Sequence, residues 1–102
     1  MLPAQEALVV QSFELQQNYP NPFNASTLMQ FYLPKESMAS LDIYDVRGRF
    51  IRNLSQGRLA AGQHTLSWDG MNAAGDAAPS GIYYARLQAP LVQQSIKMVL
   101  LR

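Results

Sequence analysis

Apolar and polar residues alternate with a period of two along most of the chain, which is the pattern of half-buried β-strands. The stretch 41–49 is the clearest example, because Leu41 and Ile43 alternate there with Asp42 and Tyr44. The period predicts a strand with one apolar face and one polar or aromatic face.

A tight turn is expected directly after this strand. Asp45 is placed to accept hydrogen bonds from the backbone N–H groups just ahead of it, and Gly48 takes a positive φ at no steric cost. Arg49 then begins a returning strand, with apolar side chains at Ile51 and Leu54. We therefore expect a β-hairpin at the centre of the fold.

Similar alternation recurs at intervals of about 8–12 residues, separated by Gly, Pro and Asn. The expected strands are 12–16, 27–33, 39–46, 49–54, 63–68, 82–88 and 93–101. Residues 56–58 and 60–62 are expected to form turns. About seven short strands and no sustained period of 3.6 predict an all-β fold, an immunoglobulin-like antiparallel β-sandwich with almost no helix.

The inward-facing parity of these strands predicts the hydrophobic core. Its members are Met29, Phe31, Leu33, Leu41, Ile43, Ile51, Leu66, Trp68, Tyr83, Leu87, Met98 and Leu100. Trp68 is interpreted as a plug at the end of a strand. Between the first two strands, residues 18–24 contain two prolines that exclude a helix, so a stiff extended crossover is expected, pinned by Tyr19 and Phe23.

The composition fits one globular domain that is not cross-linked by disulfides or metal. A chain of 102 residues buries roughly 65% of its unfolded surface, so a core needs neither disulfide nor metal. The absence of cysteine excludes a disulfide framework and a thiol nucleophile. The net charge of +1 gives no case for nucleic acid, and no apolar run approaches the ~20 residues of a membrane-spanning helix.

The chain divides into two parts. Residues 1–11 are interpreted as a linker or the end of a preceding passenger, although Leu8 to Val10 would suit a short strand. The first ten residues lack the positively charged start of a secretory signal, which favours a module cut from a longer protein. Residues 12–102 form the expected β-sandwich domain.

Catalytic chemistry is not indicated. His64 is the only histidine and is predicted to be a packed or hydrogen-bonded side chain rather than a base. Asp69, Asn72 and Asp76 provide oxygen atoms in one loop, but they lack the alternate-residue spacing of a calcium loop. We expect a turn in which Asp and Asn side chains bond the backbone, with no metal and no cofactor.

Four aromatic residues have outward parity, namely Tyr32, Tyr44, Phe50 and Tyr84. Tyr44, Phe50 and Tyr84 would share one outer face if their strands are neighbours. Such a face can stack on sugar rings, it can be cross-strand aromatic pairing on a solvent-facing sheet, or it can be covered by a neighbouring domain. An accessory carbohydrate-binding or structural module of a multidomain extracellular enzyme is therefore the alternative function.

Six motifs follow one another along the chain, namely 15–24 (LQQNYPNPFN), 43–49 (IYDVRGR), 61–64 (AGQH), 68–70 (WDG), 80–83 (SGIY) and 97–102 (KMVLLR). This ordered set resembles the type A C-terminal sorting domain of the type IX (Por) secretion system. The residues that carry the resemblance are Pro20, Asn21, Pro22, Asp45, Gly48, Arg49, Gly62, Trp68, Gly81 and Tyr83. The immunoglobulin-like domain of flagellar hook-capping proteins shares much of the pattern. Ala25 and Ala39 depart from the family, which often has proline and a larger β-branched residue there.

The resemblance implies a non-catalytic secretion signal. Such domains direct a passenger, fused N-terminal to them, from the periplasm through the outer-membrane type IX components to the cell surface or medium, and a sortase-like peptidase commonly removes them. Recognition is expected at the end of the chain, in Lys97, Met98, Val99, Leu100, Leu101 and Arg102. There an exposed last strand would offer a docking edge and two charges.

Overall fold

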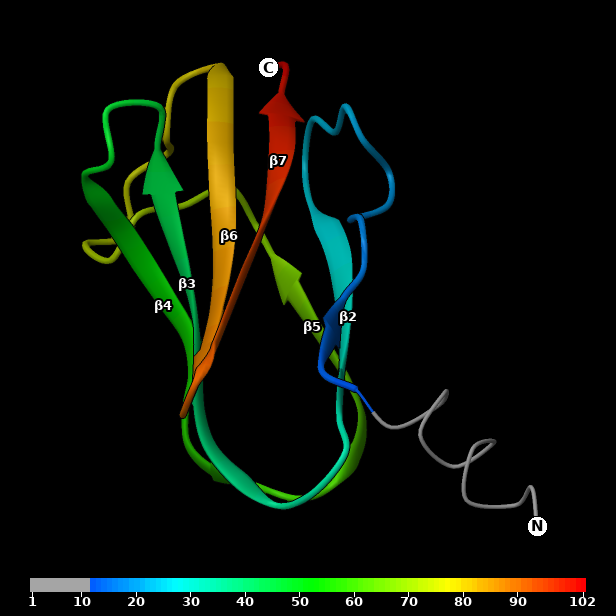
Figure 1. The fold of residues 1–102 in the computed structure, drawn as a ribbon. Helices are drawn as coiled ribbons and strands as arrows, with labels where there is room; N and C mark the ends of the chain where they lie inside the picture. The colour runs from blue at the N-terminus through cyan, green and yellow to red at the C-terminus, as the bar shows by residue number, and fades with distance from the viewer. Residues whose placement is uncertain (1–11) are drawn as a thin grey trace, which may run out of the picture.

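Two antiparallel β-sheets pack face to face in the computed structural model, which describes residues 12–102 (Figure 1). The smaller sheet contains β1 (Glu14–Leu15), β2 (Thr27–Leu33) and β5 (Gly62–Trp68), in the order β1-β2-β5. The larger sheet contains β3 (Ser37–Asp45), β4 (Phe50–Leu59), β6 (Gly81–Ala89) and β7 (Val92–Leu100), in the order β4-β3-β6-β7. The predicted seven-stranded sandwich is confirmed.

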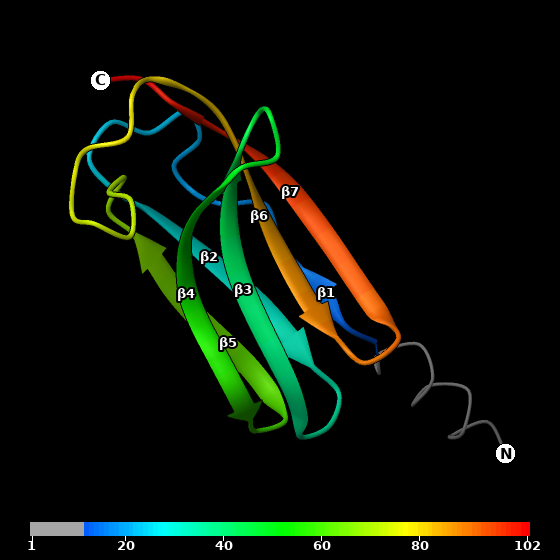
Figure 2. The ribbon, with the colours of Figure 1, turned by 90° about the vertical axis from the view of Figure 1, so that its left-hand side faces the viewer.

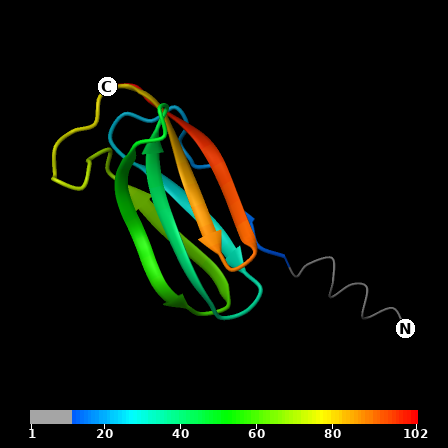
Figure 3. The same ribbon diagram turned by 60° about the vertical axis from the view of Figure 1, so that its left-hand side comes forward.

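The part of the chain that the structure describes contains no helix, and hence none long and apolar enough to cross a membrane. The strands of both sheets run along the long axis of the sandwich (Figure 2). The connections from β2 to β3 and from β4 to β5 lie at one end. The β3–β4 turn, the loop before β6 and the C-terminus lie at the other (Figure 3).

The observed strands differ most from the expected ranges at β1 and β4. β1 covers Glu14 and Leu15 only, because the chain leaves the ladder after Gln16 and enters the crossover. The expected turn at 56–58 is wrong, since Gly57 lies opposite Ala39 within β4 and the pairing continues to Leu59. Residues 1–11, including the possible strand at 8–10, lie outside the described residues.

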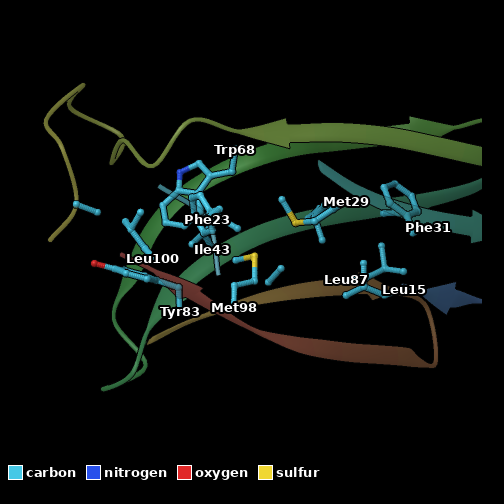
Figure 4. Packing of buried hydrophobic residues seen from close by; sticks show 14 of the residues in the cluster. Leu15, Phe23, Met29, Phe31, Ile43, Trp68, Tyr83, Leu87, Met98 and Leu100 are labelled. Atoms are coloured by element: carbon cyan, nitrogen blue, oxygen red, sulfur yellow. The ribbon is translucent and has the colours of Figure 1, made fainter. Parts of the chain in front are cut away.

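The predicted core is confirmed except at two positions on edge strands. Ile51 on β4 and Leu66 on β5 are only partly buried, because each strand has a neighbour on one side only. Figure 4 shows how side chains from both sheets interlock between them. Among the described residues, five buried apolar ones were not in the predicted set, namely Leu15, Phe23, Ala39, Ala78 and Ala85.

His64 is a packed side chain, as predicted. Its ring stacks on Phe31 with centroids 5.1 Å apart, and Nε2 lies 2.7 Å from the carbonyl oxygen of Ala60. These contacts place the imidazole at the free edge of the smaller sheet.

Along one side of the sandwich, the two sheets are linked by the hydrogen bonds of a side-chain amide. Gln94 on β7 donates from Nε2 to the carbonyl of Phe13 at 3.0 Å and accepts at Oε1 from the N–H of Leu15 at 2.7 Å. The amide thus substitutes for a strand ladder between β1 and β7, and it joins the two sheets.

The β3–β4 turn forms as the sequence predicts. Oδ1 of Asp45 accepts the backbone N–H groups of Arg47 and Arg49, each at 2.9 Å, and Gly48 has φ +83°. Oδ2 of Asp45 also accepts from Nε of Arg49 at 2.9 Å. The backbone N–H of Arg49 is the main cause that lowers the pKa of Asp45; the Arg49 side chain and the Arg47 N–H add to it, and partial desolvation opposes them.

We expect Asp45→Asn to reduce the free energy of unfolding at neutral pH and to have a smaller effect in acid. The folded pKa of Asp45 lies below its ordinary value of 3.8. The carboxylate therefore stabilises the fold fully above that value, and the contribution is lost as the pH falls through the folded pKa. Urea midpoints of both proteins across this range measure the gap. A gap that stays constant with pH would contradict the assignment.

Candidate functional site

The end of the chain lies where two loops converge on β7. Segment 17–23, between β1 and β2, runs beside the outer edge of β7, and loop 69–80, between β5 and β6, lies against residues 100–102. We call residues 97–102 together with segment 17–23 and loop 69–80 the C-terminal corner. Both loops and the C-terminus gather at the same end of the sandwich (Figure 1).

The outer edge of β7 is covered at its end by segment 17–23. Oδ1 of Asn21 accepts from the N–H of Val99 at 2.9 Å. Phe23 donates its N–H to the carbonyl of Val99 at 3.0 Å and accepts at its own carbonyl from the N–H of Leu101 at 2.9 Å. The expected open docking edge is therefore wrong here, because these backbone groups are already paired.

The crossover is held by buried polar groups and by one aromatic ring. Asn18 donates from Nδ2 to Oγ1 of Thr27 at 2.9 Å, and Thr27 donates to the carbonyl of Pro20 at 2.8 Å. The peptide bonds before Pro20 and Pro22 are both cis. Phe23 is 3% exposed, as expected of an anchor, whereas Tyr19 is 78% exposed.

Sequence reasoning therefore misplaced one anchor and missed two polar residues. Tyr19 holds the crossover through its backbone, which exchanges two 2.9 Å hydrogen bonds with Leu28. Asn18 and Thr27 were not singled out, although both are almost fully buried. The available signal was their position at the two ends of a proline-rich segment, where unpaired backbone carbonyls need donors.

Three aromatic side chains form the floor of the corner. The ring of Trp68 lies 5.2 Å from Tyr83 in a T-shaped arrangement and 5.6 Å from Phe23 (Figure 4). Trp68 donates Nε1–H to the carbonyl of Met71 at 2.9 Å, and Tyr83 donates its hydroxyl to the carbonyl of Pro79 at 2.7 Å. Burial raises the pKa of the Tyr83 hydroxyl, with the charge of Asp45 adding to the shift. The prediction that Trp68 plugs the end of a strand is confirmed.

Arg102 fastens loop 69–80 to the end of the chain. Its Nε donates to the carbonyl of Ala78 at 2.6 Å and its Nη2 to the carbonyl of Gly70 at 2.7 Å. Its backbone N–H donates to Oγ of Ser80 at 2.8 Å. The guanidinium of Arg102 is thus bonded within the domain, whereas the sequence led us to expect a charge available to a partner. Lys97 is exposed, so its charge can still be reached by a partner.

Alternation along β7 separates the remaining residues of the segment. Met98 and Leu100 are fully buried between the sheets, and Val99 is partly buried. Leu101 is 54% exposed. It lines a hollow of about 310 Å³ with Pro20, Pro22, Phe23 and Asn24. Lys97 and Leu101 are therefore the side chains of the segment that a partner can reach most directly.

The family residues of the sequence resemblance gather at this end of the molecule, with one exception. A second hollow, of about 270 Å³, includes Asp45, Arg49, Gly81 and Tyr83 in its lining, so the β3–β4 turn adjoins the corner. Gly62 begins β5 at the opposite end. Apart from Gly62, the positions that carry the resemblance therefore lie in or next to the residues around the C-terminal segment.

Loop 69–76 is a hydrogen-bonded turn, as predicted. Asp69 accepts at Oδ1 from the backbone N–H of Met71 at 3.0 Å and from Nη1 of Arg52 at 2.9 Å. Asn72 accepts at Oδ1 from the N–H groups of Ala74 and Asp76 at 2.9 and 3.0 Å. The side-chain oxygens of Asp69 and Asn72 therefore satisfy the backbone of their own loop.

The three outward aromatic residues share one face, as predicted. Tyr44 is the Cα partner of Phe50 on β4 and of Tyr84 on β6. The rings of Tyr44 and Phe50 meet edge to face with centroids 6.1 Å apart. This arrangement is the cross-strand aromatic pairing that stabilises a sheet, and it leaves Phe50 55% exposed.

Comparison with known proteins identifies relatives of this sandwich. The sequence pattern of the FlgD Ig-like domain matches residues 18–91. The basal-body rod modification protein FlgD of Salmonella typhimurium is 37% identical over 65 residues, which are 59% of this chain and 28% of that protein. The match thus spans less than a third of the length of that relative.

Solved structures share the fold. PorZ of Porphyromonas gingivalis, described as an essential bacterial surface component of the type IX secretion system, superimposes with a TM-score of 0.58 at 18% identity. The match covers 98% of this chain and 12% of that one. Dimeric latent PorU of the same organism gives 0.67 at 18% identity, over 90% and 10%. FlgD from Xanthomonas campestris, studied for hook capping, gives 0.52 at 21% identity, over 97% and 74%. At these identities the likeness establishes the fold alone.

We expect Gly70→Ala to destabilise the corner through Arg102. A Cβ on Gly70 would lie 2.7 Å from Nη2 of Arg102, and the residue has φ +75°. Gly75→Ala is the matched control, since Gly75 lies in the same loop with φ +90° and has open space around it. Both should lose roughly 1–2 kcal/mol to backbone strain. Gly70→Ala should lose an additional ~1 kcal/mol or more, measured by urea unfolding.

A double-mutant cycle isolates this additional loss. In an Arg102→Ala background, the two glycine substitutions should cost the same, because the colliding group is gone. Equal costs already in the parent chain would contradict the role assigned to Arg102.

Proposed function

This chain belongs to the FlgD Ig-like domain family, and from that premise we propose that it is a non-catalytic C-terminal sorting domain. It directs a passenger across the outer membrane through the type IX secretion system to the cell surface. The family itself includes flagellar proteins, so the secretion role needs support of its own. That support comes from the ordered motifs of residues 13–102 and from the fold shared with a type IX surface component.

One observation carries the proposal. Residues of the resemblance that lie far apart in sequence meet at the last six residues. Asn21 accepts the N–H of Val99, and Tyr83, in edge-to-face contact with Trp68, is the Cα partner of Met98. A signal at the end of a chain is more readily read when its shape is set in advance, because the receptor does not have to order it on binding. The corner supplies such a preset shape.

The surface of the corner suits recognition by a protein receptor. Lys97 offers a positive charge, and Leu101 adjoins the 310 Å³ hollow whose lining includes two prolines. An apolar side chain of a receptor can enter that hollow, while an acidic group pairs with Lys97. Arg102 acts indirectly in this scheme, by holding the loop beside the hollow.

The position of the passenger is compatible with this surface. The described chain begins toward the end of the sandwich that is opposite the corner (Figure 3). A preceding passenger therefore leaves the corner clear for the outer-membrane components. Removal of the domain by a sortase-like peptidase would act before residue 12, in the expected linker.

A structural role in a larger assembly is the second candidate. It is favoured by the family assignment and by the 37% identity to FlgD of Salmonella typhimurium. In that case the domain would act as a spacer or cap, and it would not be needed for export. Exchange of the domain for an unrelated sandwich separates the two functions, since a spacer tolerates the exchange and a sorting signal does not.

We expect the 102-residue chain to export a periplasmic reporter fused before it in a host with a type IX system. Deletion of residues 97–102 should retain the reporter in the periplasm. That deletion also removes the buried Met98 and Leu100, so surface variants are more informative. Leu101→Asp should keep the fold and reduce export several-fold or more, because a charge is placed beside an apolar hollow.

Leu91→Asp is the matched control, since Leu91 is a fully exposed leucine in the β6–β7 turn, far from the corner. It should export like the parent chain. Reporter that stays in the periplasm with the parent chain would refute the sorting function. Normal export of Leu101→Asp would refute the role of the hollow while leaving the sorting function standing.

A further inference from the structure

We propose that the outer face of the larger sheet binds an anionic saccharide. This surface adjoins the C-terminal corner and shares Lys97 with it, and the inference does not depend on the secretion role. It begins with a row of four side chains, one from each strand, namely Phe50, Tyr44, Tyr84 and Lys97. Each is the Cα partner of the next, from β4 across β3 and β6 to β7. We call these residues the tyrosine row.

The row presents fixed aromatic surface. The guanidinium carbon of Arg86 lies 4.3 Å from the centroid of the Tyr44 ring, and the edge-to-face contact with Phe50 holds the ring from another side. Tyr44 is thereby locked, and Phe50 and Tyr84 flank it with partly exposed rings. Aromatic rings with a polar tip suit ligands that combine C–H faces with hydroxyl groups.

Two cationic side chains on this face, Lys97 in the row and Arg86 next to it, lack an acidic partner among the described residues. Within residues 12–102, neither Arg86 nor Lys97 forms an ion pair, and Nε of Arg86 is buried without a hydrogen-bond partner. Asp42, which lies opposite Arg86 in the ladder, instead accepts from Nδ2 of Asn53 at 2.6 Å. The guanidinium of Arg86 lies over Tyr44 on β3 and Lys97 lies on β7, so the two cations stand on either side of Tyr84 on β6. An anionic ligand stacked on Tyr84 would therefore lie between two positive charges.

The rest of the face is rich in amides and hydroxyls. Between the row and the β6–β7 turn, its side chains include Ser40, Asn53, Gln56, Gln88, Gln93 and Ser95, with Met38 at the far end. Ser40, Gln56 and Gln88 line a shallow hollow of about 340 Å³ together with the apolar Met38, Ala89 and Pro90. The volume is near the lower end of the ~300–1,000 Å³ found for small-molecule sites. Ser40 and Tyr44 are four residues apart on β3, or about 13 Å at ~3.3 Å per residue.

These features favour a saccharide over a protein partner. A protein interface is expected to have an apolar centre, whereas the exposed aliphatic side chains of this face, Met38 and Ile82, lie near its opposite ends. Hydroxyl-rich rings match the amide and serine groups, aromatic rings stack on their C–H faces, and the unpaired cations select a ligand with carboxylate, sulfate or phosphate groups. A short anionic oligosaccharide lying along β3 would reach from the hollow to the tyrosine row.

The test is native gel electrophoresis of the 102-residue chain through gels containing polygalacturonate, with dextran as the neutral comparison. Polygalacturonate should retard the chain and dextran should not. Tyr84→Ala and Lys97→Gln should each raise the apparent dissociation constant for polygalacturonate, measured from the retardation, by about tenfold. Added salt should weaken binding further, since part of the attraction is between charges.

Matched controls exclude general charge and aromatic effects. Lys35→Gln removes the same charge from the turn between β2 and β3, and Tyr32→Ala removes a half-buried tyrosine from the outer face of the other sheet. Both should migrate like the parent chain, and thermal unfolding should show that Lys97→Gln is folded. Absence of retardation, or equal loss in Lys35→Gln and Lys97→Gln, would overturn the proposal. Equal retardation by polyglutamate would also overturn it, in favour of an acidic peptide.

Discussion

The pairing of segment 17–23 with β7 is the constraint on which the rest of the structure depends. The last strand of a sheet exposes a row of backbone N–H and C=O groups, which is a template for unwanted pairing. Here Asn21 and Phe23 supply the missing partners at the end of β7. Because the same segment connects β1 to β2, it also ties one sheet to the other. Gln94 makes a second tie further along the same side.

This constraint changes how the end of the chain can act in recognition. A free terminal strand would invite a receptor to add a strand of its own, as in β-augmentation. With Val99 and Leu101 already bonded, that route is closed along the end of β7. Recognition is instead expected to use side chains on a preformed surface, of which Lys97 and Leu101 are the most accessible. The corner and the tyrosine row then provide two adjoining surfaces on one small domain, with Lys97 common to both.

Most of the fold was predictable from the sequence, because a period of two is a local property of the chain. The turn at Asp45 and Gly48 was predictable for the same reason, because its hydrogen bonds join residues that are close in sequence. Gly57 was misread, since a glycine in a strand and a glycine in a turn look alike until the residue opposite is known. Ile51 and Leu66 have inward parity, but only the strand order shows that they lie at free edges.

The corner was not predictable in the same way, because its bonds join residues distant in sequence. Asn21 and Val99 are 78 positions apart, and no pattern in either segment names the other. The partners of Arg102 are backbone carbonyls, which any sequence would supply. The resemblance selected residues that lie mostly at this end of the molecule, and the structure shows the contacts that several of them make. The shared face of Tyr44, Phe50 and Tyr84 was predictable in part. The parity of each strand predicted that the three side chains point outward, but only the strand order shows that they are neighbours.

The central claim is that the end of β7 is bonded to segment 17–23 rather than free, and amide hydrogen exchange tests it most directly. The N–H groups of Val99 and Leu101 should be protected to nearly the same degree as those of the central strand β3. Asn21→Ala should accelerate exchange at Val99 while leaving β3 protected, because the acceptor of that one bond is lost. Exchange at Val99 and Leu101 as fast as in an unstructured peptide, with β3 still protected, would contradict the account.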